Sequence, residues 1–342
     1  MISVKPAGGA GGTAWNLYKL AGTEWVLIKA DLGVGAGRLE IFGDTMFYSN
    51  NVGLYRSIDF GANFTMVLAD GRAVAIGSDG TVWATTVDLT ETDKSKIWKS
   101  TEDGAPGTWS LSHTIIKAPL VGYQVRLNSI DVNPNNPLYI AACGSRISGT
   151  VGGRQCVVST DGGAHWTEYD DFVSNFAGKD DNMHILWGQS NRLIVTHRIK
   201  LQISISDTLG ASWDVVYDTP EPVSPGWTRD FIRAGMWLWA CEDGSAGLKQ
   251  LQRSGTNGET WEEVWAPVLR PHKGLAYNGG NEALYLAVNY PGDIADADRI
   301  KPSAGSDPAS TRIHLQYDWA TAMGGDGVGV IAYQGIAVYL GT

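Results

Sequence analysis

The stretch Ser159–Trp166 reads STDGGAHW, and close variants of it return along the chain. They are SIDFGANF at Ser57–Phe64, SDTLGASW at Ser206–Trp213, SGTNGETW at Ser254–Trp261 and a looser copy, STEDGAPGTW, at Ser100–Trp109. A degenerate copy, YKLAGTEW at Tyr18–Trp25, keeps only the glycine and the closing aromatic residue of the pattern. The closing aromatic residues recur at intervals of about 39 to 57 residues, which indicates one supersecondary unit repeated along the chain.

Each copy has the composition of a tight hairpin turn. An Asp or Thr side chain bonds backbone amides, a glycine permits a left-handed backbone, and the aromatic residue packs between neighbouring units. We expect these turns to be held by Ser57, Asp59, Gly61, Phe64, Ser100, Gly104, Trp109, Ser159, Asp161, Gly163, Trp166, Ser206, Gly210, Trp213, Ser254, Gly258 and Trp261. Since Thr208 and Thr256 replace the aspartate and Glu102 is longer, those three turns are expected to be less rigid.

The copies match the pattern S-x-D-x-G-x-x-W, and the chain resembles the Asp-box (BNR) repeat β-propellers. That superfamily includes sialidases, sortilin-type receptors, xyloglucanase-type hydrolases and photosystem-assembly factors. The stretch SIDVNPNNPLYIAA at Ser129–Ala142 resembles the first two strands of a blade in the last three of these groups. The resemblance covers nearly the whole chain and implies a propeller fold. It implies almost nothing about function, because the Asp-box residues stabilise a turn and are shared by propellers with different functions.

Seven pairs of apolar segments alternate with the turns, from RLEIFG and TMFYSN to GVGVIAYQ and IAVYLGT. They predict an all-β fold, a single seven-bladed β-propeller of four-stranded antiparallel blades over residues 13–342. Its last blade is shared by residues 13–30 and 327–342, and the ring closes by pairing Ile336–Thr342 with Trp15–Leu20. The outer hairpin of the sixth blade is predicted near Arg312–Trp319, and residues 1–12 are predicted to be a flexible Gly-rich leader.

The composition restricts the class of partner. The chain has 342 residues, only 18% of them charged, and a formal net charge of -10. An acidic surface argues against general affinity for nucleic acid or anionic membrane, and no apolar run is long enough to span a bilayer. The segment MISVKPAGGAGG lacks the pattern of a signal peptide, so we expect synthesis in the cytoplasm. The Gly-rich, weakly charged composition suggests assembly into a virion.

Neither the cysteines nor the histidines form a recognisable chemical motif. Cys143, Cys156 and Cys241 are odd in number, which favours buried thiols, although a bridge between Cys143 and Cys156 on neighbouring strands stays open. The six histidines have no metal-binding spacing, and the acidic run Asp293–Arg299 lacks the pattern of a calcium loop. We therefore predict no metal and no cofactor.

The two faces of the predicted ring differ in loop length. Within each predicted blade, strands A to D are counted from the centre of the ring outward. The A–B turns and the C–D turns, which are the box turns, are short, whereas the long loops all fall on the other face. The predicted long loops are Asp88–Lys94, Gly144–Arg154, Asn289–Ser310, Lys117–Gln124, Asp171–Asp181, Thr219–Thr228 and Ala266–Pro271. Long loops on a rigid scaffold are where binding usually occurs, so function is expected on the face opposite the box turns.

The candidate binding residues are polar groups at strand ends on that face, together with one loop tryptophan. They are Trp227, Arg229, Arg126, His184, His197, Glu242, Asp243 and His272, with Arg198, Asp230 and Lys273 beside them. Trp227 lies among prolines in the stretch PEPVSPGWTRD, and either offers an exposed platform for a sugar ring or a partner side chain, or folds back over the core as a lid.

Three functions compete. The first is a non-enzymatic binding or assembly module that contacts a protein partner or a glycan, with a virion or phage tail as one setting for it. The second is a glycan-cleaving hydrolase. Sialidase action would use inward-pointing arginines such as Arg126, Arg229 and Arg72, but the early Arg-Ile-Pro signature of that family is missing. The third is an assembly factor for a larger complex, and the basic stripe and export signal expected of the photosystem factors are both absent.

Overall fold

The structure is a computed structural model of the chain. It describes residues 2–6, 16–21, 24–29, 39–42, 44–50, 52–87, 94–116, 123–148, 151–170, 183–197, 202–218, 227–243, 251–265, 272–278, 283–290, 294–300, 313–315 and 325–331. Within these ranges the chain is almost entirely β-strand, and the single helical element is the short 3-10 turn η1, Gln189–Asn191. The fold is therefore all-β, as the sequence predicts.

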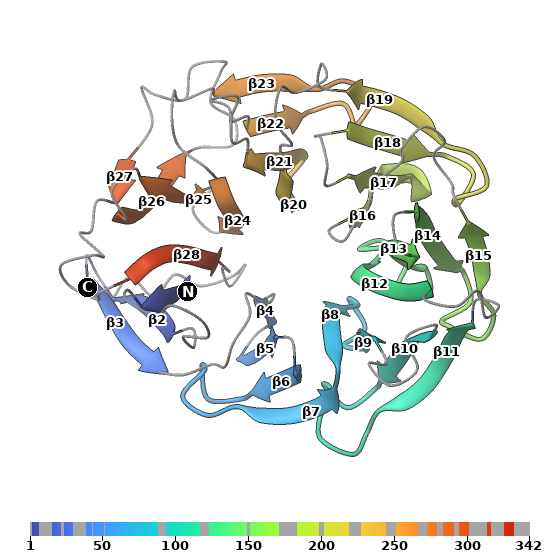
Figure 1. The fold of residues 1–342 in the computed structure, drawn as a ribbon, viewed down its shortest axis with the longest axis horizontal. Helices are drawn as coiled ribbons and strands as arrows, with labels where there is room; N and C mark the ends of the chain where they lie inside the picture. The colour runs from blue at the N-terminus through green and yellow to red at the C-terminus, as the bar shows by residue number, and fades with distance from the viewer. Residues whose placement is uncertain are drawn as a thin grey trace.

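The described strands form seven four-stranded antiparallel sheets arranged as a ring (Figure 1). Five sheets follow the chain from β4 to β23. Their strands are β4 (Leu39–Phe42), β5 (Thr45–Ser49), β6 (Gly53–Ser57) and β7 (Thr65–Ala69); β8 (Gly71–Ile76), β9 (Val82–Val87), β10 (Lys94–Ser100) and β11 (Ser110–Ile116); β12 (Tyr123–Val132), β13 (Ile140–Ser148), β14 (Val151–Ser159) and β15 (Thr167–Asp170); β16 (His184–Trp187), β17 (Leu193–Thr196), β18 (Gln202–Ser206) and β19 (Asp214–Asp218); and β20 (Trp227–Ala234), β21 (Trp237–Asp243), β22 (Leu251–Ser254) and β23 (Glu262–Trp265).

Two further sheets complete the set. One consists of β24 (His272–Asn278), β25 (Ala283–Tyr290), β26 (Ile294–Ile300) and β27 (Ile313–Leu315). The other has the order β28-β1-β2-β3, with β28 at Gly325–Ile331, β1 at Ile2–Pro6, β2 at Asn16–Ala21 and β3 at Glu24–Lys29. The two ends of the chain thus meet in one sheet, which lies beside β4 in the ring (Figure 1).

Packed side chains establish five blades, not seven, and this corrects the predicted seven-bladed ring. Buried apolar clusters fill the spaces between successive sheets from β4 to β23. A further cluster joins the β4–β7 sheet to Leu17 of β2. For the β24–β27 sheet the structure describes the backbone pairing alone. The established fold is an all-β propeller whose blades have four strands each.

The closing sheet also differs from the prediction. Its strand β1 lies between β28 and β2, pairing Ile2 with both Ile331 and Tyr18. Part of the predicted leader is therefore a central strand, whereas the predicted closing strand Ile336–Thr342 lies outside the described residues. A proline and the adjoining glycines hid this strand from pattern reading, since Pro6 can only end a central strand and the glycines favour turns.

Six of the predicted apolar pairs do form the inner hairpins, from β4–β5 to β24–β25. Two predicted loops are instead strands. The stretch Gly144–Arg154 continues as the β13–β14 ladder as far as Ser148 opposite Val151, and most of Asp293–Arg299 belongs to β26. Such residues read as loops because glycines and aspartates are depleted in strands, but cross-strand pairing overrides that weak preference.

Each box turn is held by its serine. The Ser57 Oγ atom accepts hydrogen bonds from the backbone N–H groups of Asp59 at 3.3 Å and Gly61 at 2.9 Å, and the serines at 100, 159, 206 and 254 do the same in their own turns. Asp59 Oδ1 then accepts from the N–H of Asn63 at 2.8 Å. Thr208 Oγ1 accepts the equivalent bond from the N–H of Ser212, also at 2.8 Å, so threonine keeps the bond that aspartate makes.

The glycine and the aromatic residue of each box pack on the preceding blade. A Cβ atom on Gly61 would meet Leu17, one on Gly104 would meet Phe47, and one on Gly210 would meet Tyr169, all within 3 Å. The closing Trp166 lies edge-on to Trp83 of the preceding blade, with 6.0 Å between ring centroids. The box turns are therefore joints between blades as well as hairpin turns.

We expect the box aspartates to make stability depend on pH in the acid range. Hydrogen bonds from Asn63 and Ser57 lower the pKa of Asp59 from 3.8 to about 2, and bonds from His165 and Ser159 do the same for Asp161. A lowered folded-state pKa stabilises the fold above about 3.8, and this contribution is lost as the pH falls through about 2.

Chemical unfolding of the wild type and of the Asp59→Asn, Asp161→Asn double variant, measured from pH 5 downward, checks this. The difference between the two proteins in the denaturant concentration at the unfolding midpoint should shrink as the pH is lowered from 5. A constant difference would mean that the carboxylates contribute nothing through their charge.

Candidate functional site at the channel mouth

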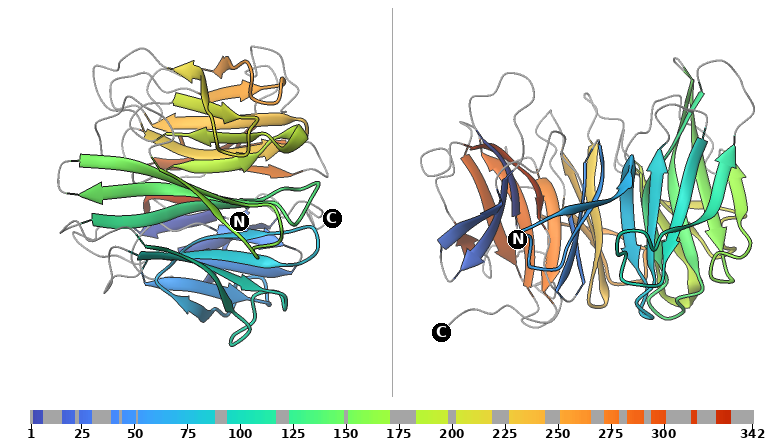
Figure 2. Two further views of the ribbon diagram at one scale, coloured as in Figure 1. Left: turned by 90° about the vertical axis from the view of Figure 1, so that its right-hand side faces the viewer. Right: turned by 90° about the horizontal axis from the view of Figure 1, so that it is seen from below.

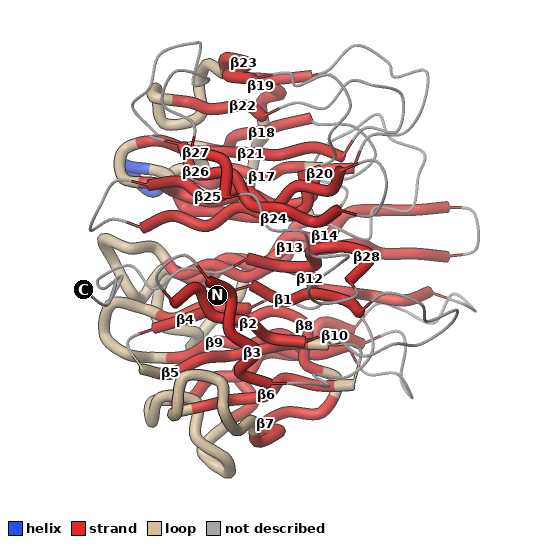
Figure 3. The backbone as a smooth tube through the Cα atoms, turned by 90° about the vertical axis from the view of Figure 1, so that its left-hand side faces the viewer, coloured by secondary structure: helices blue, strands red, loops and turns tan. Residues whose placement is uncertain are grey.

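The described turns and the long strands point to opposite faces of the ring. The box turns and the short turns gather on one side (Figure 3). The hairpin of β13 and β14, nine residues in each strand, projects on the other side (Figures 2 and 3). The innermost strands β4, β8, β12, β16, β20, β24 and β28 surround the centre of the ring (Figure 1). The hairpin-side ends of these strands, here called the channel mouth, are the candidate site.

A β-bulge recurs in the innermost strands β8, β12, β20 and β24, and β28 has two, with Asp326 and Gly329 inserted opposite β1. It lies between Gly71 and Ala73 in β8, between Leu127 and Ser129 in β12, between Thr228 and Asp230 in β20, and between His272 and Gly274 in β24. These four bulges and the one at Asp326 lie about 15 Å from the box-side end of their strands, and therefore at a similar level along the axis of the ring. Bulges re-aim side chains and are enriched next to binding sites.

Asp326 in β28 is acidic, but three of the five residues inserted at this level are cationic. They are Arg72, Arg229 and Lys273, and Asn128 occupies the bulge of β12. Arg126 precedes the β12 bulge and pairs with Ser145 at the base of the projecting hairpin. We call these four cationic positions, Arg72, Arg126, Arg229 and Lys273, the mouth cations. A chain of net charge -10 thus places several positive residues, together with Asp326, near one level of its ring.

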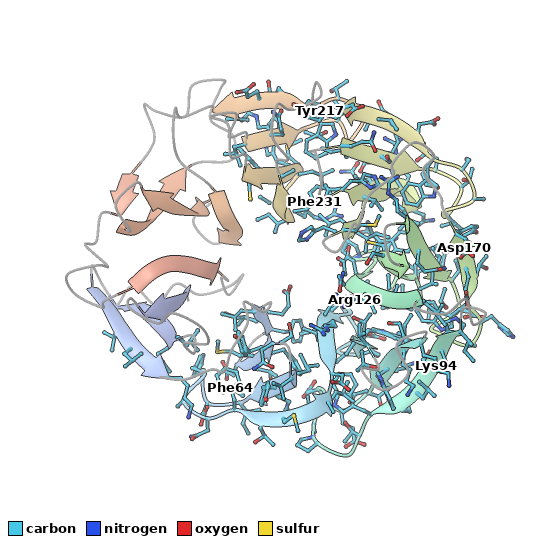
Figure 4. All side chains as sticks on the ribbon, in the orientation of Figure 1. Phe64, Lys94, Arg126, Asp170, Tyr217 and Phe231 are labelled. Carbon is cyan, nitrogen blue, oxygen red and sulfur yellow. The ribbon has the colours of Figure 1, made fainter. Side chains whose placement is uncertain are left out.

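Buried hydroxyl groups fix the backbone beside Arg72 and Arg126. Thr85 Oγ1 accepts from the N–H of Ala73 at 3.2 Å and donates to the carbonyl of Leu127 at 2.8 Å, so one side chain joins the two strands. Ser49 Oγ donates to the carbonyl of Arg72 at 2.9 Å. Thr85 is fully buried, and Ser49 nearly so. This arrangement holds the two arginines in fixed relative positions at the inner rim, where Figure 4 shows Arg126.

The two guanidinium groups are close enough to influence each other. Burial lowers the pKa of Arg72, the charge of Arg126 lowers it further, and Asp70 opposes both effects. Both arginines are half-buried, so they also remain partly open to solvent. Two like charges held together in a fixed framework favour an anionic group between or above them.

A second polar cluster lies deeper, between the β12–β15 and β16–β19 blades. Arg154 shares a rung of the sheet with Ser145 and Arg126. Burial, and then the charge of Arg154, lower the pKa of His197 well below its ordinary range. His197 Nε2 lies 3.3 Å from Ser204 Oγ, and both side chains are buried. His197 is therefore a neutral interior group at neutral pH. It does not offer a proton donor to the channel.

The other predicted site residues fall into two groups. His184 begins β16, pairs with Thr196 and is 7% exposed, so its side chain belongs to the interior. Trp227 and Asp243 are paired at the open end of β20 and β21, with Thr228 opposite Glu242 on the next rung. Trp227 was predicted to lie in a loop, whereas it starts a strand. The side chains of Trp227, Arg229, Asp230, Glu242, Asp243, His272 and Lys273 lie outside the described residues, as does Arg198 entirely.

The sequence reading missed Arg154 and gave Arg72 only a passing place as a possible sialidase arginine. A bulge leaves no mark in an alternating pattern beyond a shift of one residue, so the common level of the mouth cations could not be read from spacing. In the described part of the chain, no three His, Cys, Asp or Glu side chains are grouped to hold a metal ion. No described helix is long and apolar enough to cross a membrane.

The comparisons with known proteins agree on the fold. No protein-family model matches the chain, and no curated protein sequence matches it significantly. Among solved structures, an ancestral GH74 enzyme matches with a TM-score of 0.52 at 16% identity over 78% of this chain, which spans only 37% of the enzyme.

Two other solved structures match over most of both chains. YCF48 bound to D1 peptide has a TM-score of 0.50 at 14% identity, covering 91% of this chain and 87% of that one. A catalytically inactive virginiamycin B lyase from Staphylococcus aureus with quinupristin has a TM-score of 0.57 at 16% identity, covering 93% and 92%. The chain therefore has the β-propeller fold, and identities this low are evidence of the fold alone.

Proposed function

We propose that this protein is a non-enzymatic binding or assembly module that holds an acidic segment of a protein partner at the mouth of its channel. The observation that supports this most is the recurring bulge, which puts Arg72, Arg229 and Lys273 at one level around the opening, with Arg126 beside them. Guanidinium groups in a fixed framework recognise carboxylates by paired, charge-assisted hydrogen bonds.

The neighbouring folds make such a role reasonable without deciding it. YCF48 has been solved with a peptide bound, whereas the GH74 neighbour is an enzyme. We also propose that the chain belongs with the Asp-box repeat propellers, because five of its turns repeat the S-x-D-x-G-x-x-W pattern or a variant of it. No neighbour supports a virion role, and an acidic glycan is the alternative ligand for the same cations.

The binding test compares two single-charge variants. Fluorescence anisotropy with a labelled polyglutamate peptide should show that Arg126→Gln weakens binding about tenfold, as expected for a lost charge-assisted contact of roughly 1.4 kcal/mol or more. Arg56→Gln is the matched control, because Arg56 lies beside the box turns and donates to the carbonyl of Asp103. It should bind like the wild type.

A second probe, polygalacturonate, separates the two ligand classes. Preference for polyglutamate supports a protein partner, and preference for polygalacturonate would replace it with an acidic glycan. Equal affinity of Arg126→Gln and Arg56→Gln for both probes would contradict the assignment of the mouth.

A further inference from the structure

The fourth residue of every box turn has a left-handed backbone. The residues are Phe60, Asp103, Gly162, Leu209 and Asn257, with φ of 57°, 51°, 70°, 55° and 55°. Glycine, asparagine and aspartate tolerate this region, whereas a bulky side chain is strained there. Three of the five boxes therefore have a suitable residue, and Phe60 and Leu209 are the exceptions.

Four of these fourth positions contact the preceding blade. Asp103 and Gly162 present their carbonyls to Arg56 and Lys99 of the preceding blade. Asn257 accepts a hydrogen bond from the N–H of Gln189 at 2.7 Å. Leu209 packs against the buried cluster of the preceding blade, which offsets its strain. Phe60 instead leaves 43% of its surface exposed.

Two more large apolar residues are exposed at the same end of this blade. Ile58, in the same turn, is 64% exposed, and Phe42, at the end of β4, is 47% exposed. The turn that follows Phe42 lies next to the box, because Met46 pairs with Ser57. Phe42, Ile58 and Phe60, here called the Phe60 patch, therefore present three large apolar side chains on one blade end. Clustered exposed apolar residues mark interaction sites more often than single ones do.

The charges around the Phe60 patch are acidic. Asp44 and Asp59 are exposed within the two turns that carry the patch, and Asp103 is exposed in the box of the next blade. The neighbouring cation, Arg56, directs its Nε atom to the carbonyl of Asp103 at 2.7 Å. A second copy of this acidic chain would meet like charges here, whereas a basic segment would meet opposite ones.

We propose that the Phe60 patch is a second docking surface, which takes a partner segment that combines apolar side chains with lysine or arginine. It lies on the box face, opposite the channel mouth (Figure 3). The module would then hold one partner on each side of its ring.

The decisive variant is Phe60→Asn, because asparagine accepts the left-handed backbone and removes the aromatic ring. Its melting temperature should equal or exceed that of the wild type. Its affinity for a synthetic amphipathic peptide of lysine and leucine, measured by anisotropy, should fall about tenfold or more. Val215→Thr removes a comparably exposed apolar group from β19, on a different blade from the Phe60 patch, and should leave the affinity unchanged.

Three results would overturn the proposal. One is equal binding of the lysine–leucine peptide by Phe60→Asn and the wild type. Another is equal binding of a glutamate–leucine peptide, which would remove the role of the acidic rim. The third is self-association in sedimentation equilibrium that Phe60→Asn abolishes, because a second copy would then be the occupant. Ile58→Asn repeats the test if Phe60→Asn fails to fold, and polyglutamate binding at the mouth should survive in both.

Discussion

Deleting residues 2–6 is expected to abolish soluble folding. These residues form β1, which pairs with β28 on one side and β2 on the other. Its loss would leave two unpaired strand edges inside the ring, and open edges both destabilise a sheet and promote aggregation. The ring would also lose the only described link between the two ends of the chain.

Size-exclusion chromatography and thermal unfolding of the deletion variant measure this effect. A synthetic peptide covering residues 1–8 is the matched control, because it can restore the missing strand in trans. Recovery of a soluble monomer with the peptide, and not with a scrambled one, is the expected result. A deletion variant that elutes and melts like the wild type would show that β1 does not close the ring.

Replacing Gly163 by alanine is expected to destabilise the fold by about 2–5 kcal/mol, the sum of a left-handed backbone penalty and an overpacked contact. Gly163 has a φ of 83°, and a Cβ atom there would meet the ring of Trp83 and lie 2.6 Å from Ser112 Oγ. Both neighbours belong to the preceding blade and are fixed by its packing. The substitution therefore tests the box turn as a joint between blades.

Gly107→Ala is the control for the backbone term alone. Gly107 also has a positive φ, 79°, but a Cβ atom there would meet nothing within 4 Å. Urea unfolding should give a loss of about 1–2 kcal/mol for Gly107→Ala. Equal losses for the two variants would mean that the close approach between blades contributes nothing.

The sequence is most informative where short patterns are tied to hydrogen bonds. The repeated serine, glycine and aromatic residue locate the box turns, and the alternating apolar segments locate six inner hairpins. The predicted count of seven blades was wrong, since side-chain packing in the described residues establishes five. The prediction also took the last apolar segment, and not β1, as the partner of β2. Strand β1 has too few apolar residues, and too much proline and glycine around it, to be recognised by pattern.

The candidate site was harder to predict than the fold. Arg126, Arg229 and Lys273 were proposed from their places near strand starts, but the bulges that put Arg229 and Lys273 level with Arg72 depend on pairing register. His184 and His197 were proposed on the same grounds, and both are buried, since a position near a strand start does not fix which way a side chain faces. Phe60 gave no signal at all, because backbone strain appears only in three dimensions.

Hydrogen–deuterium exchange with and without saturating polyglutamate peptide tests the central claim most directly. If the channel mouth is the binding site, the peptide should slow exchange at the starts of β8, β12 and β20 and along the β13–β14 hairpin, and leave the box turns unchanged. Slower exchange confined to the box turns, with no change at those strand starts, would contradict it.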